Sequence, residues 1–267
     1  MNPPQKADKE PVIVVENLTM QFGDNVILQD VSFEVFKGEI FVIVGVSGCG
    51  KTTLFKNLIG LYKPTAGRIF IEGRDITTDD ETVLNHLRRT IGVLFQAGAL
   101  IGSMTLADNV ALPLMGQSPL SLATMDRIVK MKLAMVNLAG YENHLPLELS
   151  GGMKKRAGLA RAMAMDPTIL FFDEPNTGLD PVTSAELDVT IKAINRGMGT
   201  TMVIVSHDLA SVMSVAHRVI MIDKSKRGII AEGDPLDLKE HSRNPKVINF
   251  FNRSLEGLKT EGASHGS

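Results

Sequence analysis

A glycine-rich stretch of the chain combines the residue types that bind phosphate. Residues 45–52 read GVSGCGKT, which fits the pattern G-x-x-x-x-G-K-[ST] in full. The glycines let the backbone curl so that several N–H groups point at phosphate oxygens, and a following helix adds the partial positive charge of its N-terminus. In this pattern Lys51 reaches the β- and γ-phosphates, and the Thr52 hydroxyl binds Mg²⁺. We expect a bound nucleotide to contact Gly45, Ser47, Gly48, Cys49, Gly50, Lys51, Thr52 and Thr53.

The chain has a single cysteine, Cys49, and it lies inside this loop. One interpretation is a redox switch, because a helix N-terminus lowers a thiol pKa and modification would then block nucleotide binding. The other interpretation is a small side chain that fits the cradle, and we favour it. A lone cysteine also excludes an internal disulfide.

Two adjacent carboxylates could supply metal binding and hydrolysis. Asp173 and Glu174 end the apolar run ILFFDE, and ligands of open α/β sheets gather at the carboxyl ends of strands. We expect Asp173 to bind Mg²⁺ and Glu174 to polarise the attacking water. An acidic pair after a strand is a weak signal alone, but together with the phosphate loop it indicates nucleotide hydrolysis.

Two further polar residues follow apolar runs that should end at the same edge of the sheet. Gln96 ends GVLFQ, and His207 follows TMVIVS. A glutamine there can bind Mg²⁺ or orient water, and a histidine can hydrogen-bond the γ-phosphate and sense its loss. Each could instead be a solvated residue at a strand end, so their roles depend on the neighbouring motifs.

The stretch LSGGM, residues 149–153, leaves the start of a predicted helix almost bare of side chains. Ser150, Gly151 and Gly152 offer unobstructed N–H donors and a helix dipole, which together form a second anion site. This site would best bind the γ-phosphate of a nucleotide held by a second copy of the chain. We therefore expect a two-fold dimer that buries two ATP molecules and opens after hydrolysis.

The elements that must position these residues follow from the hydrophobic pattern. Residues 12–22 and 25–35 alternate as antiparallel strands do, whereas several other short apolar runs are typical of buried parallel strands. Strands that alternate with helices predict an α/β fold with a mainly parallel sheet. Residues 97–165 are mostly helical in pattern and would be inserted into it.

Composition limits the class of protein. The chain has 267 residues, 44% of them hydrophobic and 22% charged, with a formal net charge of −2. These values are typical of a globular protein and give no global electrostatic case for nucleic-acid binding. We see no signal peptide and no apolar run long enough to span a membrane, so any membrane role would be borrowed from a partner.

The motifs of this chain occur in the order found in the ATP-binding subunits of ABC transporters, which the chain resembles. These motifs are the phosphate loop, Gln96, LSGGM, ILFFDE, the GLD that ends at Asp180, and His207. The match covers residues 12–233. The resemblance implies a P-loop ATPase fold with an N-terminal antiparallel β subdomain, an inserted helical subdomain, and ATP and Mg²⁺ as ligands. It also implies that Asp180 contacts nucleotide and that Phe22 stacks on adenine, where the family commonly has tyrosine. Met153 departs from the frequent glutamine, which puts the contact of that position in doubt.

The surroundings of Gln96 and Met153 resemble the ATPases of Mla/MCE-type systems, which move phospholipids and other hydrophobic substrates between the inner membrane and the outer envelope of bacteria. This implies two copies beneath two permease subunits, at the cytoplasmic face of the inner membrane, with MCE-domain proteins on the far side. The segment ALIGSM, residues 99–104, would line the groove for the permease or form internal core. Residues 244–257 resemble the C-terminal extension of that subfamily, which contacts the partner ATPase.

We therefore expect an N-terminal tail (residues 1–11), an ATPase domain (12–240) with the helical subdomain at about residues 97–160, and a C-terminal extension (241–267) with a flexible end. One alternative is the ATPase of an amino-acid or lipoprotein transporter. Another is a soluble ABC-type ATPase that acts on chromosomes or ribosomes, but the chain lacks coiled-coil heptads and has one cassette. A GTPase is disfavoured because an N-K-x-D element is missing.

Overall fold

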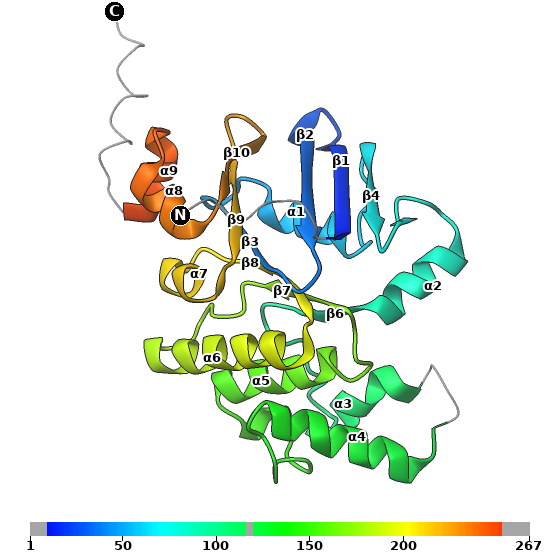
Figure 1. The fold of residues 1–267 in the computed structure, drawn as a ribbon. Coiled ribbons are helices and arrows are strands. Elements are labelled where there is room, and N and C mark those ends of the chain that lie inside the picture. Colours follow the sequence, from blue (N-terminus) through cyan, green and yellow to red (C-terminus); the bar gives the residue numbers. More distant parts are fainter. Residues whose placement is uncertain (1–9, 116–119, 253–267) are drawn as a thin grey trace, which may run out of the picture.

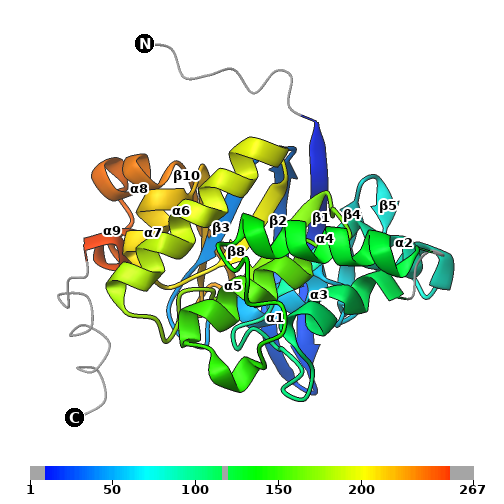
Figure 2. The ribbon, with the colours of Figure 1, turned by 90° about the horizontal axis from the view of Figure 1, so that it is seen from below.

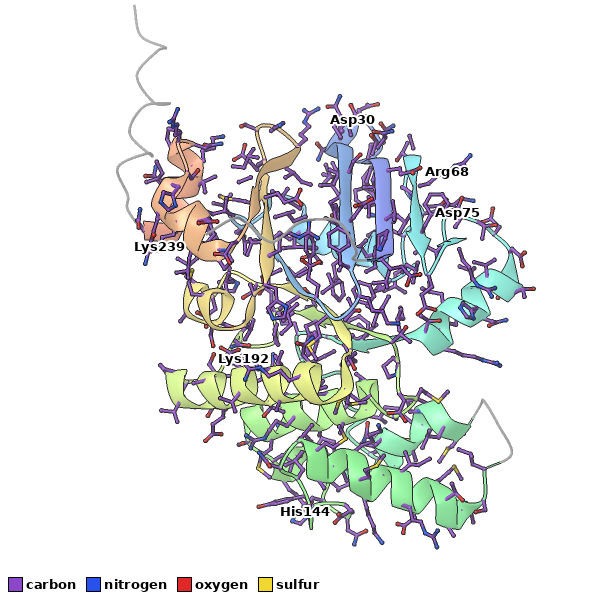
Figure 3. The ribbon with its side chains drawn as sticks, viewed as in Figure 1. Asp30, Arg68, Asp75, His144, Lys192 and Lys239 are labelled. Atoms are coloured by element: carbon purple, nitrogen blue, oxygen red, sulfur yellow. The ribbon has the colours of Figure 1, made fainter. Side chains whose placement is uncertain are left out.

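The computed structural model describes residues 10–115 and 120–252, and they form two sheets and several helices (Figure 1). Most of the expected N-terminal tail and the end of the C-terminal extension lie outside the described residues. Charged side chains such as Asp30, Arg68 and Lys239 lie at the periphery (Figure 3). Within the described residues, no helix is both long enough and apolar enough to cross a membrane.

A mostly parallel, six-stranded sheet forms the centre of the molecule. In spatial order its strands are β10 (Gly228–Gly233), β9 (Arg218–Asp223), β3 (Ile40–Val44), β8 (Thr201–Val205), β7 (Ile169–Asp173) and β6 (Ile91–Leu94). Neighbouring strands run parallel, except that β10 pairs antiparallel with β9. The α/β prediction is confirmed, and the carboxyl ends of β3, β6, β7 and β8 meet at one edge of the sheet.

An antiparallel sheet covers one face of this centre. Its strands, in order, are β2 (Asn25–Phe36), β1 (Pro11–Phe22), β4 (Ala66–Ile71) and β5 (Arg74–Asp75). Helix α1 (Lys51–Leu58) packs between the two sheets, because its Leu54, Phe55 and Leu58 share one core with side chains of both. The strands expected before the phosphate loop are therefore confirmed as a separate layer.

Strand β3 contributes to two different cores. Ile40, Val42 and Val44 pack in the core beneath the helices, whereas Phe41 and Ile43 pack in the core shared with the antiparallel sheet. All five side chains are at most 1% exposed. This alternation follows from the two-residue period of a strand, and it explains why the sequence is apolar without interruption. The strand that carries the phosphate loop is thus packed from both sides.

The chain between β6 and β7 is helical, as expected. It contains α3 (Leu106–Met115), α4 (Leu122–Met135), the short 3₁₀ helix η1 (Pro146–Glu148) and α5 (Gly151–Ala162). Figure 2 shows α4, α5 and α6 (Pro181–Met198) in front of the strands. Helix α5 also touches the sheet, because a Cβ on Gly92 of β6 would lie 2.1 Å from the Ala162 carbonyl oxygen. It therefore connects the helical part to the parallel sheet.

Helix α2 (Glu81–Thr90) precedes β6, and sequence reasoning did not identify it. Its residues are mostly polar and only Leu87 and Thr90 are buried, so its apolar periodicity is short. The Asp80 side chain caps its start by accepting a hydrogen bond from the Thr82 N–H.

The C-terminal part packs on the helical side of the sheet. It contains α7 (Leu209–Val215), α8 (Pro235–His241) and α9 (Pro245–Asn252). Val247 and Phe251 of α9 are buried in the core beneath the helices, and the Lys246 ammonium lies 2.9 Å from a carboxylate oxygen of Asp223 at the end of β9. The described part of the C-terminal extension is thus a helix that packs on its own chain.

Candidate functional site

The phosphate loop lies between the buried strand β3 and helix α1. A Cβ on Gly45 would lie 2.4 Å from the Ile222 carbonyl oxygen, so only glycine fits there. Gly50 caps α1 in a left-handed conformation (φ 107°) and makes no side-chain hydrogen bond to the helix start. Ser47, Gly48 and Thr52 are exposed, whereas Gly45 is buried and Gly50 and Thr53 are half-buried. The first N–H groups of α1 therefore lack a side-chain cap and are open to an anion.

Lys51 lies over its own loop. Its ammonium donates to the carbonyl oxygens of Gly45 (2.9 Å) and Val46 (3.2 Å), and the residue is only 7% exposed. Both acceptors belong to the loop, so the cation lies at the cradle that the sequence motif predicts. A buried ammonium beside uncapped N–H groups favours binding of a strongly charged anion such as a phosphate.

Cys49 is packed rather than presented to solvent. It is 2% exposed and belongs to the core between the sheets. Burial raises the pKa of its thiol, and the nearby Lys51 cation offsets this only in part. A protonated, buried thiol is a poor nucleophile, which favours the interpretation of Cys49 as a small packing residue.

Asp173 and Glu174 stand at the end of β7, on the edge that the phosphate loop also reaches. Burial raises the pKa of Asp173, the neighbouring Glu174 adds to the rise, and lysines including Lys51 oppose it. A cation bound beside Asp173 would relieve this electrostatic cost. The oxygens of Asp173, Thr52 and Gln96 are hard ligands of the kind that Mg²⁺ prefers. Within the described residues, no cluster of three or more His, Cys, Asp or Glu side chains offers a separate metal site.

Glu174 is held by both its backbone and its side chain. Its N–H donates to the Val205 carbonyl oxygen of β8 (2.9 Å), and its φ of 46° is left-handed. The Thr177 hydroxyl donates to one carboxylate oxygen (3.0 Å), and Nδ1 of His207 lies 3.2 Å from the other. Sequence reasoning expected Glu174 and His207 at the same edge, and the structure places them in contact.

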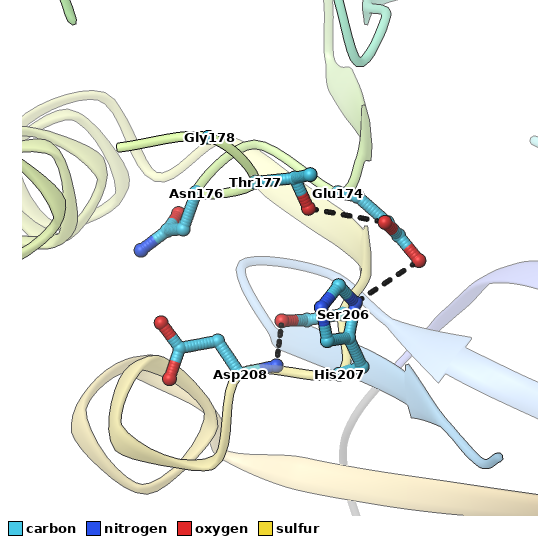
Figure 4. A pocket seen from close by; sticks show the side chains of 7 residues that line it. All are labelled: Glu174, Asn176, Thr177, Gly178, Ser206, His207 and Asp208. Atoms are coloured by element: carbon cyan, nitrogen blue, oxygen red, sulfur yellow. Dashed lines mark hydrogen bonds and ion pairs between the residues drawn. The ribbon is translucent and has the colours of Figure 1, made fainter. Parts of the chain in front are cut away.

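A cavity of about 330 Å³ opens beside this pair (Figure 4). It is lined by Glu174, Asn176, Thr177, Gly178, Ser206, His207 and Asp208. Figure 4 shows the Glu174 carboxylate between Thr177 and His207. The lining residues come from the segments that follow β7 and β8, so the carboxylate and the imidazole face a common space.

Gln96 lies at the same edge, two residues beyond the end of β6, and is exposed. The loop that carries it is fixed from α5: the Arg161 guanidinium donates to the carbonyl oxygens of Ala99 (2.7 Å) and Gly98 (3.0 Å). Sequence reasoning missed Arg161, which lies far from Gln96 in the chain.

The start of α5 at Ser150 is the second predicted anion site. The Ser150 hydroxyl accepts a hydrogen bond from the Met153 N–H (3.3 Å) and thereby caps the helix. Gly151 is exposed, and the nearest atom to a Cβ there would be a Leu179 methyl at 3.8 Å. Gly152 differs, because a Cβ there would lie 2.3 Å from a Thr183 methyl. The second glycine is therefore required by packing against α6, and the first leaves the helix start open.

Asp180 caps the start of α6. One carboxylate oxygen accepts from the N–H groups of Val182 and Thr183 (both 3.0 Å), and the other accepts from the Thr183 hydroxyl (2.6 Å). The hydrogen bonds from Thr183 lower the pKa of Asp180. Asp180 thus has a structural role that sequence reasoning did not foresee, beside its expected role at the nucleotide.

Phe22 ends β1 and is 47% exposed. Its ring meets Tyr62 edge to face, with 5.7 Å between the ring centroids. The exposed part of the ring offers an aromatic surface of the kind that stacks on a base.

Sequence reasoning also missed Lys155 and Thr177. Lys155 follows Gly152 by three residues and precedes Leu159 by four, which places it on the buried stripe of α5. A lysine on a buried stripe is an available signal, because such a cation needs a partner. Thr177 gives no comparable signal, since its contact depends on the turn that follows Glu174.

Comparisons with known proteins show the family of the chain. The model of the ABC transporter family matches residues 28–177. The MlaF protein of Haemophilus influenzae, an intermembrane phospholipid transport ATP-binding protein, is 40% identical over 92% of this chain and 92% of its own. The mkl protein of Mycobacterium tuberculosis, a probable ribonucleotide transport ATP-binding protein, is 42% identical over 90% of this chain and 66% of its own.

A solved structure agrees with the fold. The dimeric ATP-binding cassette MJ0796 in a post-hydrolysis state, bound to ADP and Pi, superposes with a TM-score of 0.75 and 30% identity. The superposition covers 83% of this chain and 98% of that one. With the phosphate loop, the Glu174–His207 pair and the open helix start in place, the chain belongs to the ATP-binding subunits of ABC transporters and is an ATPase of that type.

Proposed function

We propose that this chain pairs with a second copy around two ATP molecules and drives phospholipid transport by a membrane ABC complex between the inner and outer membranes. The observation that carries the hydrolytic part is the Glu174 carboxylate, which lies between the Thr177 hydroxyl and His207 and faces a cavity. A carboxylate fixed at both oxygens at the end of a parallel strand is suited to orient a water molecule.

Within one nucleotide site, the chain's own residues divide the work. The phosphate loop and Lys51 bind the phosphates, and Phe22 supports the base. Glu174 accepts a proton from the attacking water, and His207 orients the Glu174 carboxylate and hydrogen-bonds the γ-phosphate. Thr52, Asp173 and Gln96 would hold Mg²⁺, which when bound neutralises charge on the phosphates.

The second copy would complete each site. Ser150 and Gly151 are exposed at the start of α5, where the Ser150 hydroxyl caps only the Met153 N–H, so the earlier N–H groups and the helix dipole favour an anion. Gly152 lets this helix start lie close to Thr183, and Asp180 holds the neighbouring start of α6. The dimeric state of the related cassette with ADP and Pi supports an arrangement in which these residues meet the partner's nucleotide.

Force would reach the membrane through the loop that follows Gln96. Ile101 is 41% exposed, while Asn109, which is fully buried, bonds both the N–H (2.8 Å) and the carbonyl oxygen (3.1 Å) of Ile101. Leu100 and Met104 are half-buried. The segment thus packs against the protein through Leu100 and Met104 and presents the apolar Ile101 at the surface in a fixed position. Such a surface is suited to bind a short helix of a permease subunit.

The phospholipid cargo is inferred from the related phospholipid transport protein. In this proposal two copies lie at the cytoplasmic face of the inner membrane beneath two permease subunits. MCE-domain proteins stand on the far side, and the C-terminal extension contacts the partner ATPase. The ribonucleotide named for the mycobacterial relative defines the competing cargo.

The test is purification of the tagged chain in gentle detergent, with mass spectrometry of the proteins and lipids that accompany it. A permease, an MCE-domain protein and bound phospholipid are expected. Ile101→Arg should lose the permease, whereas Leu236→Arg, which alters an exposed leucine of α8, should retain it. A solute-binding protein with another permease and no lipid would contradict the phospholipid cargo and leave the ATPase intact.

A further inference from the structure

Helix α5 carries a buried lysine that the roles above do not use. Lys155 is 6% exposed, and its ammonium lies 3.5 Å from the carbonyl oxygen of Glu174. A lysine is rarely buried without a partner, because removing its charge from water is costly. The partner of this buried ammonium is the Glu174 carbonyl oxygen, in the turn that follows β7.

The turn that Lys155 contacts has an unusual backbone. Glu174 has a left-handed φ of 46°, which side chains other than glycine rarely adopt. Its N–H is tied to Val205 (2.9 Å), and its carbonyl oxygen also accepts from the Thr177 N–H (3.2 Å). The Lys155 cation adds a charge-assisted contact at this carbonyl, and this contact stabilises the left-handed backbone of Glu174.

The direction of the Glu174 carboxylate depends on this backbone. The side chain reaches Thr177 on one oxygen and His207 on the other, and both contacts require the turn to hold its shape. The Lys155 ammonium thus contacts the backbone of Glu174, and Lys155 is not among the residues that line the cavity beside the carboxylate.

We propose that Lys155 is a positioning residue for hydrolysis, whose ammonium holds the left-handed Glu174 backbone and so aims the Glu174 carboxylate. This inference rests on the role of Glu174 in the proposed function. It also gives α5 two tasks within one chain. The helix starts at Ser150, which would face the partner's nucleotide, and five residues later it contacts the turn of its own Glu174. Binding of the partner's nucleotide at Ser150 would then affect the orientation of the Glu174 carboxylate in the chain's own nucleotide site.

The proposal separates turnover from binding. Among the hydrogen bonds of the described residues, the Lys155 ammonium donates to the Glu174 carbonyl oxygen and to no atom of the phosphate loop or Phe22. Its loss should therefore lower kcat and leave ATP affinity unchanged. A misaimed reacting group costs about ten- to a hundredfold in rate. Loss of a lysine that only stabilised the fold would instead change both kcat and ATP affinity, or neither.

The experiment compares Lys155→Met, Lys155→Arg and the matched control Lys154→Met in the full chain, purified with its accompanying partners. Methionine keeps the apolar stem without the charge, and arginine keeps the charge. We expect Lys155→Met to retain ATP affinity within about twofold, measured with a fluorescent ATP analogue, and to lose about tenfold or more in kcat. Lys155→Arg should recover most of the rate, and Lys154→Met should be normal.

A normal kcat in Lys155→Met, a parallel loss of ATP affinity, or a failure of Lys155→Arg to recover any rate would overturn the proposal. If Lys155→Met does not melt cooperatively, Lys155→Gln replaces it with the same expected results. Glu174→Gln is measured beside them. Turnover in Glu174→Gln would defeat the proposed role of Glu174 itself, whereas an inactive Glu174→Gln with a fully active Lys155→Met would defeat only the role of Lys155.

Discussion

Replacing Gly152 with alanine should separate the packing of the α5 start from its openness to an anion. The new Cβ would lie 2.3 Å from a Thr183 methyl, which is closer than two carbon atoms can approach. Thr183 cannot simply rotate, because its hydroxyl donates to Asp180 at 2.6 Å and a β-branched side chain has few alternatives. The clash must therefore move α5 away from α6.

The size of the effect follows from two opposing terms. Overpacking of this kind costs about 1–3 kcal/mol. Alanine in place of glycine inside a helix recovers about 0.5–1 kcal/mol. We expect Gly152→Ala to lower the free energy of unfolding by about 1 kcal/mol, within a range of about 0–2.5 kcal/mol, and a loss of about 1 kcal/mol lowers the melting temperature by about 2–4 °C. Gly151→Ala, whose Cβ meets nothing nearer than Leu179 at 3.8 Å, should be neutral or slightly stabilising.

The assay pairs thermal unfolding with ATP turnover in four variants. Thr183→Ser removes the clashing methyl and keeps the hydroxyl, so Gly152→Ala combined with Thr183→Ser should recover most of the lost stability. Gly151→Ala should lose turnover without losing stability, because its Cβ enters the space where the partner's phosphate is expected. The reasoning fails if Gly151→Ala destabilises the chain as much as Gly152→Ala does, or if Thr183→Ser brings no recovery.

Four further variants test single residues. Lys51→Ala should abolish ATP binding in an equilibrium binding assay, and unchanged affinity would refute the phosphate-loop assignment. Glu174→Gln should bind ATP normally yet show no phosphate release, so normal turnover would remove Glu174 from its role. Ser150→Arg should block hydrolysis while the single chain still binds ATP; hydrolysis at the normal rate would argue against a site completed by the partner. Because Asp180 has a lowered pKa, its carboxylate stabilises the fold above the unfolded pKa of about 3.8, and this contribution is lost as the pH falls through the lower folded pKa. Chemical denaturation should therefore show that Asp180→Asn is less stable than the natural chain at neutral pH and that the difference narrows as the pH falls below the unfolded pKa of about 3.8; a difference independent of pH would contradict this.

Short-range patterns were enough to predict the phosphate loop, the strand before it and the acidic pair. These features depend on residues that are neighbours in sequence, such as the run from Gly45 to Thr52 and the apolar strand that ends at Asp173. The contact between Glu174 and His207 could be expected in outline, because both follow parallel strands that end at one edge.

Contacts between distant segments could not be predicted in the same way. The glycine at position 152 looked like part of an anion site, but its close approach to Thr183 depends on how α5 and α6 meet. The left-handed backbone of Glu174 and the reach of Lys155 toward it depend on the turn between β7 and α6. Helix α2 was missed because only two of its residues are buried.

The two-sided packing of β3 has a consequence for engineering this ATPase. The five side chains of β3 alternate between two cores, so a substitution at any of them disturbs packing. The strand that positions the phosphate loop therefore tolerates little redesign. The segment between β6 and β7 is different, because it exposes Ile101 in the loop before α3 and Met115 at the end of α3, and its helices contact the sheet chiefly through α5. A designer who wished to connect this ATPase to a chosen membrane protein would leave β3 unchanged and vary the outer faces of α3 and α4.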